Sequence, residues 1–193
     1  AGPPAQSPRT QEETVRCTHL GGSMRHATLF GLGVVATLML VSGPAWPVPT
    51  VYFEPAEVQV ERGQPFSVGI RIDAGADTLT CFLVEFSFDE ETIELVSAAE
   101  GTLMAECGFP TMFDWDQIAP GMHSCNDVTL GYDSFALCPG ELVRVDFVAL
   151  AEGSTTLDFS AVDLRDIRRE RILPVATGGG SVTVVQGTGL MEE

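Results

Sequence analysis

The sequence predicts an all-β fold, an antiparallel two-sheet β-sandwich of about nine strands with a jelly-roll-like arrangement. Three observations support this prediction. Short segments with alternating apolar and polar residues recur from Val51 to Val184, turn-forming residues separate them, and no segment shows the period of a long amphipathic helix. Alternation with a period of two is typical of strands that have one buried face and one solvated face.

Turn-forming residues divide the chain into the expected strands. Glycine, proline or acidic residues lie between the alternating runs at Arg62–Gly63, Gly75–Asp77, Asp89–Glu91, Pro139–Gly140 and Glu152–Ser154. In chain order, we expect strands at Val51–Phe53, Glu57–Glu61, Phe66–Asp73, Leu79–Phe88, Ile93–Ala98, Asp127–Tyr132, Glu141–Ala149, Ser154–Val162 and Ser181–Val185.

The alternation also assigns an inward face to the longer strands, because every second residue of a strand points to the same side. The stretch Gly101–Asn126 is the least regular part of the chain, and we expect no strand in most of it. The residues expected to face the core are Val68, Ile70, Ile72, Phe86, Phe88, Leu95, Val143, Val145, Phe147, Leu157 and Val182.

One domain is expected, preceded by an export signal. Met24 opens a short basic stretch, Ala27–Val41 is apolar, and small residues follow as far as Ala45, which is the layout of a secretory signal peptide. The apolar run of about 15 residues is shorter than the roughly 20 that span a bilayer, so membrane attachment is expected only if this segment stays uncleaved. We divide the chain into a disordered leader or start-site artefact (1–23), a signal peptide (24–45), the sandwich domain (46–185) and a flexible tail (186–193). The expected location is secreted, periplasmic or cell-surface.

The chain is strongly acidic. It carries 27 aspartate and glutamate residues against 10 basic residues, which gives a formal net charge of −17. A surface of this charge repels nucleic acids and anionic membranes, so neither is expected as a partner.

Four cysteines follow the signal segment, and an even number in an exported chain predicts two disulfides. Three connectivities are open. We favour Cys107–Cys125, which closes the irregular stretch, together with Cys81–Cys138, which links distant strands. The spacings lack a CxxC motif, and His123 is the only histidine after the signal segment, so neither a metal nor another cofactor is expected.

No residue pattern indicates an enzyme. Asp114 and Asp116 form a carboxylate pair of the kind that glycosidases use, but we favour a plain polar loop as the explanation of these two residues. His123, Ser124 and Asp127 are the residue types of a hydrolase triad. Neighbours in sequence rarely form a triad, however, and no nucleophile-elbow motif is present.

Four pieces of the chain, in this order, carry a family resemblance: Glu61–Phe66, Phe86–Ser97, Gly140–Phe147 with Gly153–Leu157 after it, and Gly179–Val184. They resemble the V-x-x-G-D-x-F opening, the Y-x-Y-D-P-x-x-L-E-V-V-S segment, the G-x-L-x-x-I-x-F strand and the closing x-G-x-V-x-V of cohesin domains. Cohesins are the modules through which bacterial scaffoldins hold dockerin-bearing enzymes. The resemblance implies a non-catalytic sandwich that binds a dockerin-like protein module in extracellular assembly or polysaccharide breakdown.

The resemblance also implies a binding surface. The dockerin-facing sheet of cohesins presents residues from two strands, which here are Thr80–Leu83 and Leu130–Asp133. Phe82 shares a strand face with the expected core residue Phe86, so both assignments hold only if a β-bulge near Cys81–Phe82 shifts the register. The implied partner-binding residues are Phe82, Val84, Tyr132 and Asp133.

Two alternatives remain open at the level of the sequence. One is a carbohydrate-binding module that recognises a polysaccharide, because Phe113 and Trp115 can stack on sugar rings. The other is a structural domain of the cell envelope. A flat line of exposed aromatic residues would favour the polysaccharide, whereas a mixed apolar and acidic sheet face favours a protein partner.

Overall fold

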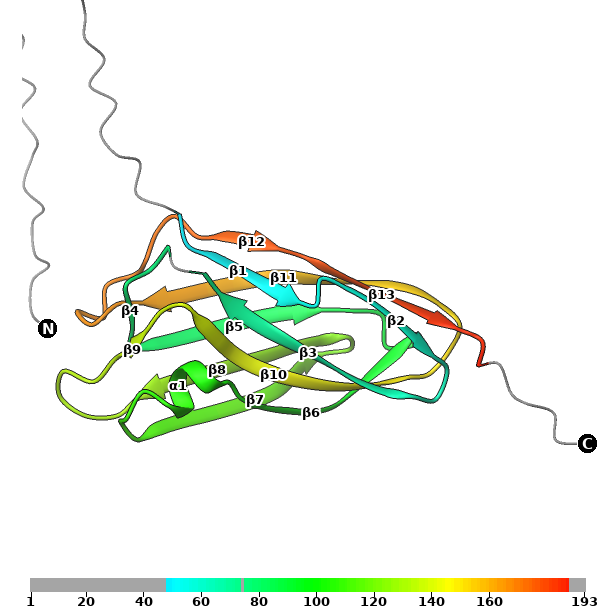
Figure 1. Cartoon of the computed structure of the whole chain (residues 1–193), viewed down its shortest axis with the longest axis horizontal. Coiled ribbons are helices and arrows are strands. Elements are labelled where there is room, and N and C mark those ends of the chain that lie inside the picture. The colour runs from blue at the N-terminus through cyan, green and yellow to red at the C-terminus, as the bar shows by residue number, and fades with distance from the viewer. Residues whose placement is uncertain (1–47, 74, 188–193) are drawn as a thin grey trace, which may run out of the picture. The chain divides into compact units, whose positions relative to one another are not determined.

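The computed structural model describes residues 48–73 and 75–187, which form a β-sandwich (Figure 1). The leader and signal peptide predicted for residues 1–45 lie outside the described residues, as do residues 188–193 of the predicted tail. Within the described part of the chain, no helix is long and apolar enough to cross a membrane.

The described chain contains thirteen strands and one short helix. In order they are β1 (Thr50–Glu54), β2 (Glu57–Glu61), β3 (Pro65–Ile72), β4 (Thr78–Leu79), β5 (Cys81–Ser87), β6 (Ile93–Glu100), α1 (Thr102–Ala105), β7 (Thr111–Ala119), β8 (Met122–Thr129), β9 (Ala136–Leu137), β10 (Gly140–Ala149), β11 (Gly153–Arg165), β12 (Ala176–Gly178) and β13 (Gly180–Val185).

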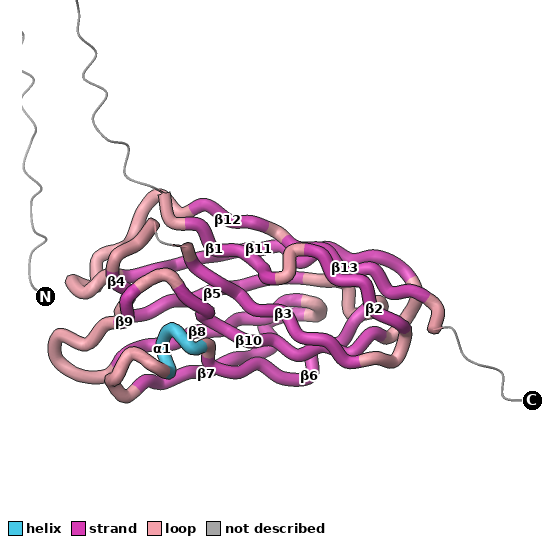
Figure 2. The backbone as a smooth tube through the Cα atoms, viewed as in Figure 1, coloured by secondary structure: helices cyan, strands magenta, loops and turns pink. Residues whose placement is uncertain are grey.

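The strands form two main sheets, with β4 and β9 as a small separate pair (Figure 2). The five-stranded sheet has the order β12-β1-β3-β10-β6, and the six-stranded sheet has the order β2-β13-β11-β5-β8-β7. All pairs are antiparallel except β1–β12 and β2–β13, which are parallel. The predicted two-sheet sandwich is confirmed, with these two parallel pairs added to its antiparallel pairing. Each parallel pair joins an early strand to a late one, and only a long connection allows parallel pairing.

Aromatic and branched aliphatic side chains fill the space between the sheets. The Phe86 ring meets the Phe53 ring edge-on with centroids 6.0 Å apart, and Phe88 meets Phe147 in the same way at 5.2 Å. All residues predicted to face the core are buried except Leu95, which is half-buried and packs against the core. At these positions the period-two pattern in the sequence therefore identified the inward-facing residues correctly.

The outer side of the five-stranded sheet is tied together by one carboxylate. Asp146 on β10 accepts hydrogen bonds from Ser67 Oγ on β3 at 2.6 Å and from Ser97 Oγ on β6 at 2.8 Å. These two hydrogen bonds, that from Ser67 first, lower the pKa of Asp146. Through these hydrogen bonds Asp146 joins three neighbouring strands, and the hydrogen bonds in turn stabilise its charged form.

The stretch expected to be irregular contains a helix and a strand. Residues 102–105 form α1, and β7 pairs with β8 in an antiparallel hairpin that turns at Pro120–Gly121. Gly121 has a φ of 63°, a left-handed conformation that favours glycine. The strand predicted at Asp127–Tyr132 is instead β8, which ends at Thr129.

We predict that Phe86→Ala lowers the free energy of unfolding by about 3–5 kcal/mol, because Phe86 is fully buried and truncation leaves a cavity between the sheets. Urea unfolding followed by fluorescence measures the change. Val96→Ala is the control, since Val96 is 61% exposed and its truncation should cost less than about 0.5 kcal/mol. Equal losses in the two variants would contradict this account of the core.

Candidate functional site

The solvent-facing side of β11, β5, β8 and β7, called the outer face below, is a continuous surface of four neighbouring strands. Residues directly opposite each other in neighbouring strands point to the same side of a sheet. The pairings therefore place three rows of side chains across the outer face: Arg165, Cys81, Val128 and Met112; Asp163, Leu83, Asn126 and Asp114; Ala161, Glu85, Ser124 and Asp116.

The outer face combines apolar and acidic groups. Met112 on β7 is 58% exposed, Val128 is half-buried opposite it on β8, and Leu83 is half-buried one strand further along, on β5. Asp163 forms ion pairs with Arg165 at 3.1 Å and with Arg171 at 3.2 Å, so its charge is balanced within the molecule. The carboxylates of Asp114 and Asp116 have no ion-pair partner within the described residues, and both residues are exposed. This face therefore offers a methionine and a leucine beside uncompensated negative charge.

Phe82 and Val84 lie on the opposite side of β5 from the outer face. Phe82 is 2% exposed and Val84 is fully buried, and both face the core with Phe86. The prediction that Phe82 and Val84 contact a partner is therefore corrected. β5 pairs with β8 without a register shift, and the only irregularity beside β5 lies on β11, between Phe159 and Ala161. The bulge that would have turned Phe82 outward is absent from β5.

Tyr132 and Asp133 lie in the loop between β8 and β9, at the end of the outer face that carries Met112. The Tyr132 side chain is 93% exposed, and Asp133 is in a left-handed conformation with a φ of 55°. Ser134 Oγ donates to Thr129 Oγ1 at 2.9 Å and so fastens the loop to the end of β8. Both residues are accessible to a partner, although a loop carries them rather than a strand.

Phe113 and Trp115 belong to the inner side of β7. Their paired residues on β8, Asp127 and Cys125, are buried, and both rings pack against the core. The Trp115 ring centroid lies 6.3 Å from that of His123. The two rings predicted to stack on sugars therefore turn away from the outer face.

The four described cysteines are free thiols, so the predicted bridges Cys107–Cys125 and Cys81–Cys138 are not formed in the structure. The direction of the Cys125 side chain explains why the Cys107–Cys125 bridge is absent. Cys125 is buried among core residues, whereas the Cys107 thiol donates to the Phe109 carbonyl at 3.7 Å. Burial raises the pKa of the Cys125 thiol to about 12. Cys81 lies on the outer face, and Cys138 follows β9 at the end of the small sheet.

Comparison with known proteins gives one consistent result. No family model and no curated protein matches the chain. A non-cellulosomal cohesin from Archaeoglobus fulgidus superposes with a TM-score of 0.59 at 18% identity, covering 72% of this chain and 92% of that one. The seventh ScaB type I cohesin from Pseudobacteroides cellulosolvens superposes with a TM-score of 0.61 at 14% identity, covering 76% of this chain and 97% of that one. The sixth cohesin of scaffoldin B from Acetivibrio cellulolyticus was solved in complex with a mutant Cel5 dockerin. It superposes with a TM-score of 0.60 at 14% identity, covering 72% of this chain and 99% of that one. The fold is the cohesin fold.

The residue types of a hydrolase triad do not meet in this cohesin fold. His123 lies on the inner side of β8, where its ring stacks on Phe88 with centroids 5.3 Å apart, and burial lowers the pKa of His123. Ser124, the next residue of the same strand, points to the outer face. Neighbouring strand residues point to opposite faces, so the serine hydroxyl and the imidazole cannot share a proton.

Two carboxyl groups meet inside the cohesin-like domain. Asp127 on β8 is 1% exposed, and Val128 N donates to its Oδ1 at 2.7 Å. Asp127 Oδ2 and Glu100 Oε1 are both buried without another hydrogen-bond partner in the described residues. Burial, and after it the adjacent Glu100 carboxyl of the other sheet, together raise the pKa of Asp127 to about 7. Asp127 therefore keeps its proton in mildly acidic solution.

We predict that this pair makes stability depend on pH. The folded protein keeps the Asp127 proton up to a pH of about 7, whereas the unfolded chain releases it near pH 4. Between these values the folded state binds more protons, so the contribution of Asp127 to the free energy of unfolding falls as pH rises, by on the order of 4 kcal/mol. Urea unfolding at a series of pH values measures it.

In Asp127→Asn this fall should disappear, because the amide does not titrate and can donate to Glu100. Asp114→Asn, a change of the same type on the outer face, should keep the pH profile of the unmodified protein. A profile of Asp127→Asn parallel to that of the unmodified protein would contradict a raised pKa of Asp127 in the folded state.

Proposed function

We propose that this chain is an exported, non-catalytic module that binds a dockerin-like protein partner through the outer face of β11, β5, β8 and β7. The observation that carries the proposal is the make-up of this face, where Met112, Leu83 and Val128 adjoin the carboxylates of Asp114 and Asp116. Apolar groups that can be desolvated beside charges that orient a partner are typical of protein interfaces.

The cohesin fold supports a partner of this class. The similar cohesin of scaffoldin B was solved with a dockerin bound, which shows that this fold can present a surface to such a module. Fold alone does not determine function, so the proposal depends on the outer face itself. The apolar segment Ala27–Val41, with its signal-peptide layout, supports export, and a role in extracellular assembly follows from export and binding together.

The aromatic residues that favoured a polysaccharide ligand do not form an exposed binding surface. Among the described residues, Tyr132 and Phe109 are the exposed aromatic side chains, and they belong to different loops. Phe113 and Trp115 pack against the core. A carbohydrate-binding surface requires aromatic rings that lie open to the sugar, and the outer face carries none among its paired residues.

We predict that Met112→Asp weakens binding by at least about thirtyfold, because it places a charge in the apolar part of the proposed interface. Calorimetric titration against a panel of dockerin modules encoded by the same genome as this chain measures the affinity. Val96→Asp is the matched control, since Val96 is 61% exposed and lies in the other sheet, so binding should change by less than about twofold. Absence of binding to every dockerin, or equal losses in both variants, would overturn the proposal.

We also predict that the double variant Asp114→Asn with Asp116→Asn slows association several-fold at low ionic strength and changes dissociation little. The uncompensated carboxylates act at long range on a basic partner, and salt screens that attraction. Stopped-flow mixing at two salt concentrations tests this. An association rate that is the same for both proteins at low salt would contradict a steering role for these charges.

A further inference from the structure

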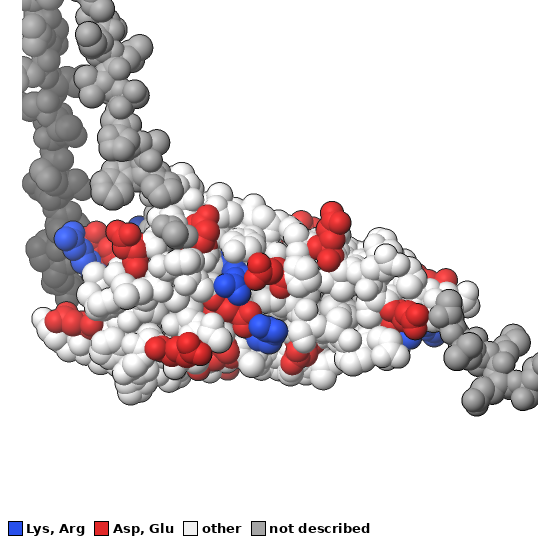
Figure 3. Space-filling view, viewed as in Figure 1, with Lys and Arg blue, Asp and Glu red and all other residues white. Residues whose placement is uncertain are grey.

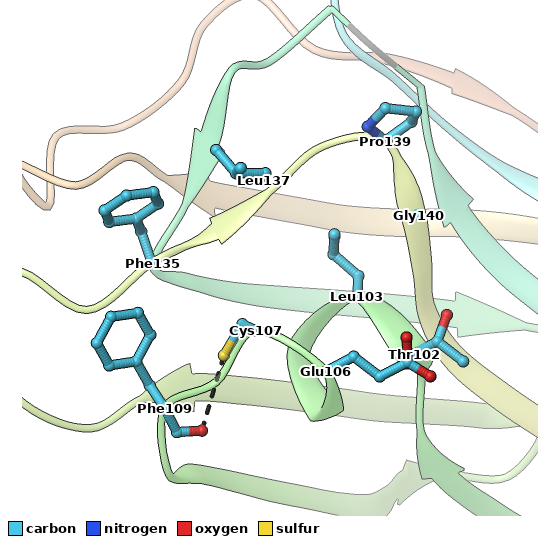
Figure 4. A pocket seen from close by; sticks show the side chains of 9 residues that line it. All are labelled: Thr102, Leu103, Glu106, Cys107, Phe109, Phe135, Leu137, Pro139 and Gly140. Atoms are coloured by element: carbon cyan, nitrogen blue, oxygen red, sulfur yellow. Dashed lines mark hydrogen bonds between the residues drawn. The ribbon is translucent and has the colours of Figure 1, made fainter.

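A second candidate binding site lies away from the outer face, between α1 and the segment that joins β9 to β10. It is a pocket of about 500 Å³ (Figure 4). Its walls come from two separate stretches of chain, 102–109 and 135–140. A volume of this size is typical of sites that enclose a ligand or a large side chain.

The floor of the pocket is closely packed. A Cβ atom at Gly140 would lie 2.8 Å from Leu103 Cβ, and one at Gly101 would lie 2.2 Å from the Glu141 carbonyl oxygen. These glycines let α1 sit directly on β10, where Leu103 and Met104 are buried. At the mouth, the Cys107 thiol donates to the Phe109 carbonyl and fixes the loop after α1 (Figure 4). The pocket is therefore formed before any partner arrives.

The rim of the pocket is apolar and open to solvent. Leu137 is 68% exposed, and the Phe109 and Phe135 rings stand side by side with centroids 6.3 Å apart. Figure 4 shows both rings on the same side of the pocket, with Leu103 and Leu137 facing the space between them and α1. An aromatic and aliphatic pocket with an open mouth suits one large apolar side chain, the kind of group that dominates interface energy.

The surroundings of the pocket are negatively charged. Glu106 is exposed at the lining, and no basic residue lines the pocket within the described part of the chain. Next to Leu137, the Cys138 thiol has its pKa raised to about 11, first by burial and then by the carboxylates of Asp73 and Asp77. Figure 3 shows a group of acidic side chains over the part of this face that carries α1. An occupant with a positive charge is therefore favoured over a neutral or anionic one.

We propose that this pocket anchors a segment of a protein partner in which a large apolar side chain stands next to a lysine or arginine. The apolar side chain enters between Leu103, Phe109 and Leu137, and the cation lies against Glu106. The site is distinct from the outer face, so it gives the domain a second contact with the same partner or with another one.

Nuclear magnetic resonance titration of the full ¹⁵N-labelled chain tests the proposal. The probes are three blocked peptides of equal length whose central pair is phenylalanine–lysine, phenylalanine–glutamate or glycine–lysine. We expect the first peptide to shift the amide signals of Leu103, Phe109 and Leu137 in a saturable way, and to bind at least about fivefold more tightly than the other two.

Paired variants separate the contribution of the apolar contact from that of the charged contact. Leu137→Ser should weaken binding of the phenylalanine–lysine peptide about fivefold, whereas Leu173→Ser, at a leucine of 69% exposure outside the pocket, should leave it unchanged. Glu106→Gln should weaken it about threefold at low ionic strength and less at high salt, while Glu91→Gln should have no effect.

Three results would overturn the proposal. One is no saturable shift at the pocket residues. Another is equal binding of the lysine and glutamate peptides. The third is a set of shifts that depends on protein concentration without peptide, which would make a second copy of this chain the occupant. None of these results bears on the outer face, whose test uses Met112 and Val96, so the two proposals fail independently.

Discussion

The orientation of β5 is the constraint on which the rest of the structure depends. This strand lies between β11 and β8, and it pairs with both along its length. Phe82, Val84 and Phe86 are all buried, so the strand cannot slip by one residue without moving three large apolar groups into water. Cross-strand pairing then passes this orientation on to β8 and from β8 to β7. Which side chains reach the outer face is therefore decided in the core.

The same constraint explains the polar groups inside the sandwich. With Phe82, Val84 and Phe86 inward, their partners on β8, namely Asp127, Cys125 and His123, must face inward too. His123 Nδ1 and Asp127 Oδ2 are consequently buried without a hydrogen-bond partner among the described residues. Buried polar atoms of this kind reduce stability unless a proton or a neighbouring group satisfies them. The carboxyl of Glu100, reaching from the other sheet, partly meets this need for Asp127.

Much of the fold was predictable because its strands obey simple alternation. The inward faces of β3, β5 and β10 follow from period-two patterns that burial enforces. β7 was missed because proline and glycine flank it and half of its residues are exposed, yet Phe113-Asp114-Trp115-Asp116 carries the alternation that marks it. For the candidate site, Phe82 was expected on the outer side of β5, but it lies in the core. Phe82 and Phe86 are an even number of residues apart, so the spacing alone would have placed both rings on the same, core-facing side of the strand. The pocket beside α1 could not be predicted, because stretches distant in sequence build it.

The central claim is that a partner covers the outer face of β11, β5, β8 and β7. Cross-saturation nuclear magnetic resonance measures directly which residues lie at the interface. A protonated dockerin is bound to the deuterated chain, and only amides near the partner lose signal. The account predicts losses centred on Leu83, Met112 and Val128, and none at Ser97 and Asp146 on the outer side of the other sheet. Losses at Ser97 and Asp146 with unchanged signals at Leu83 and Met112 would contradict it.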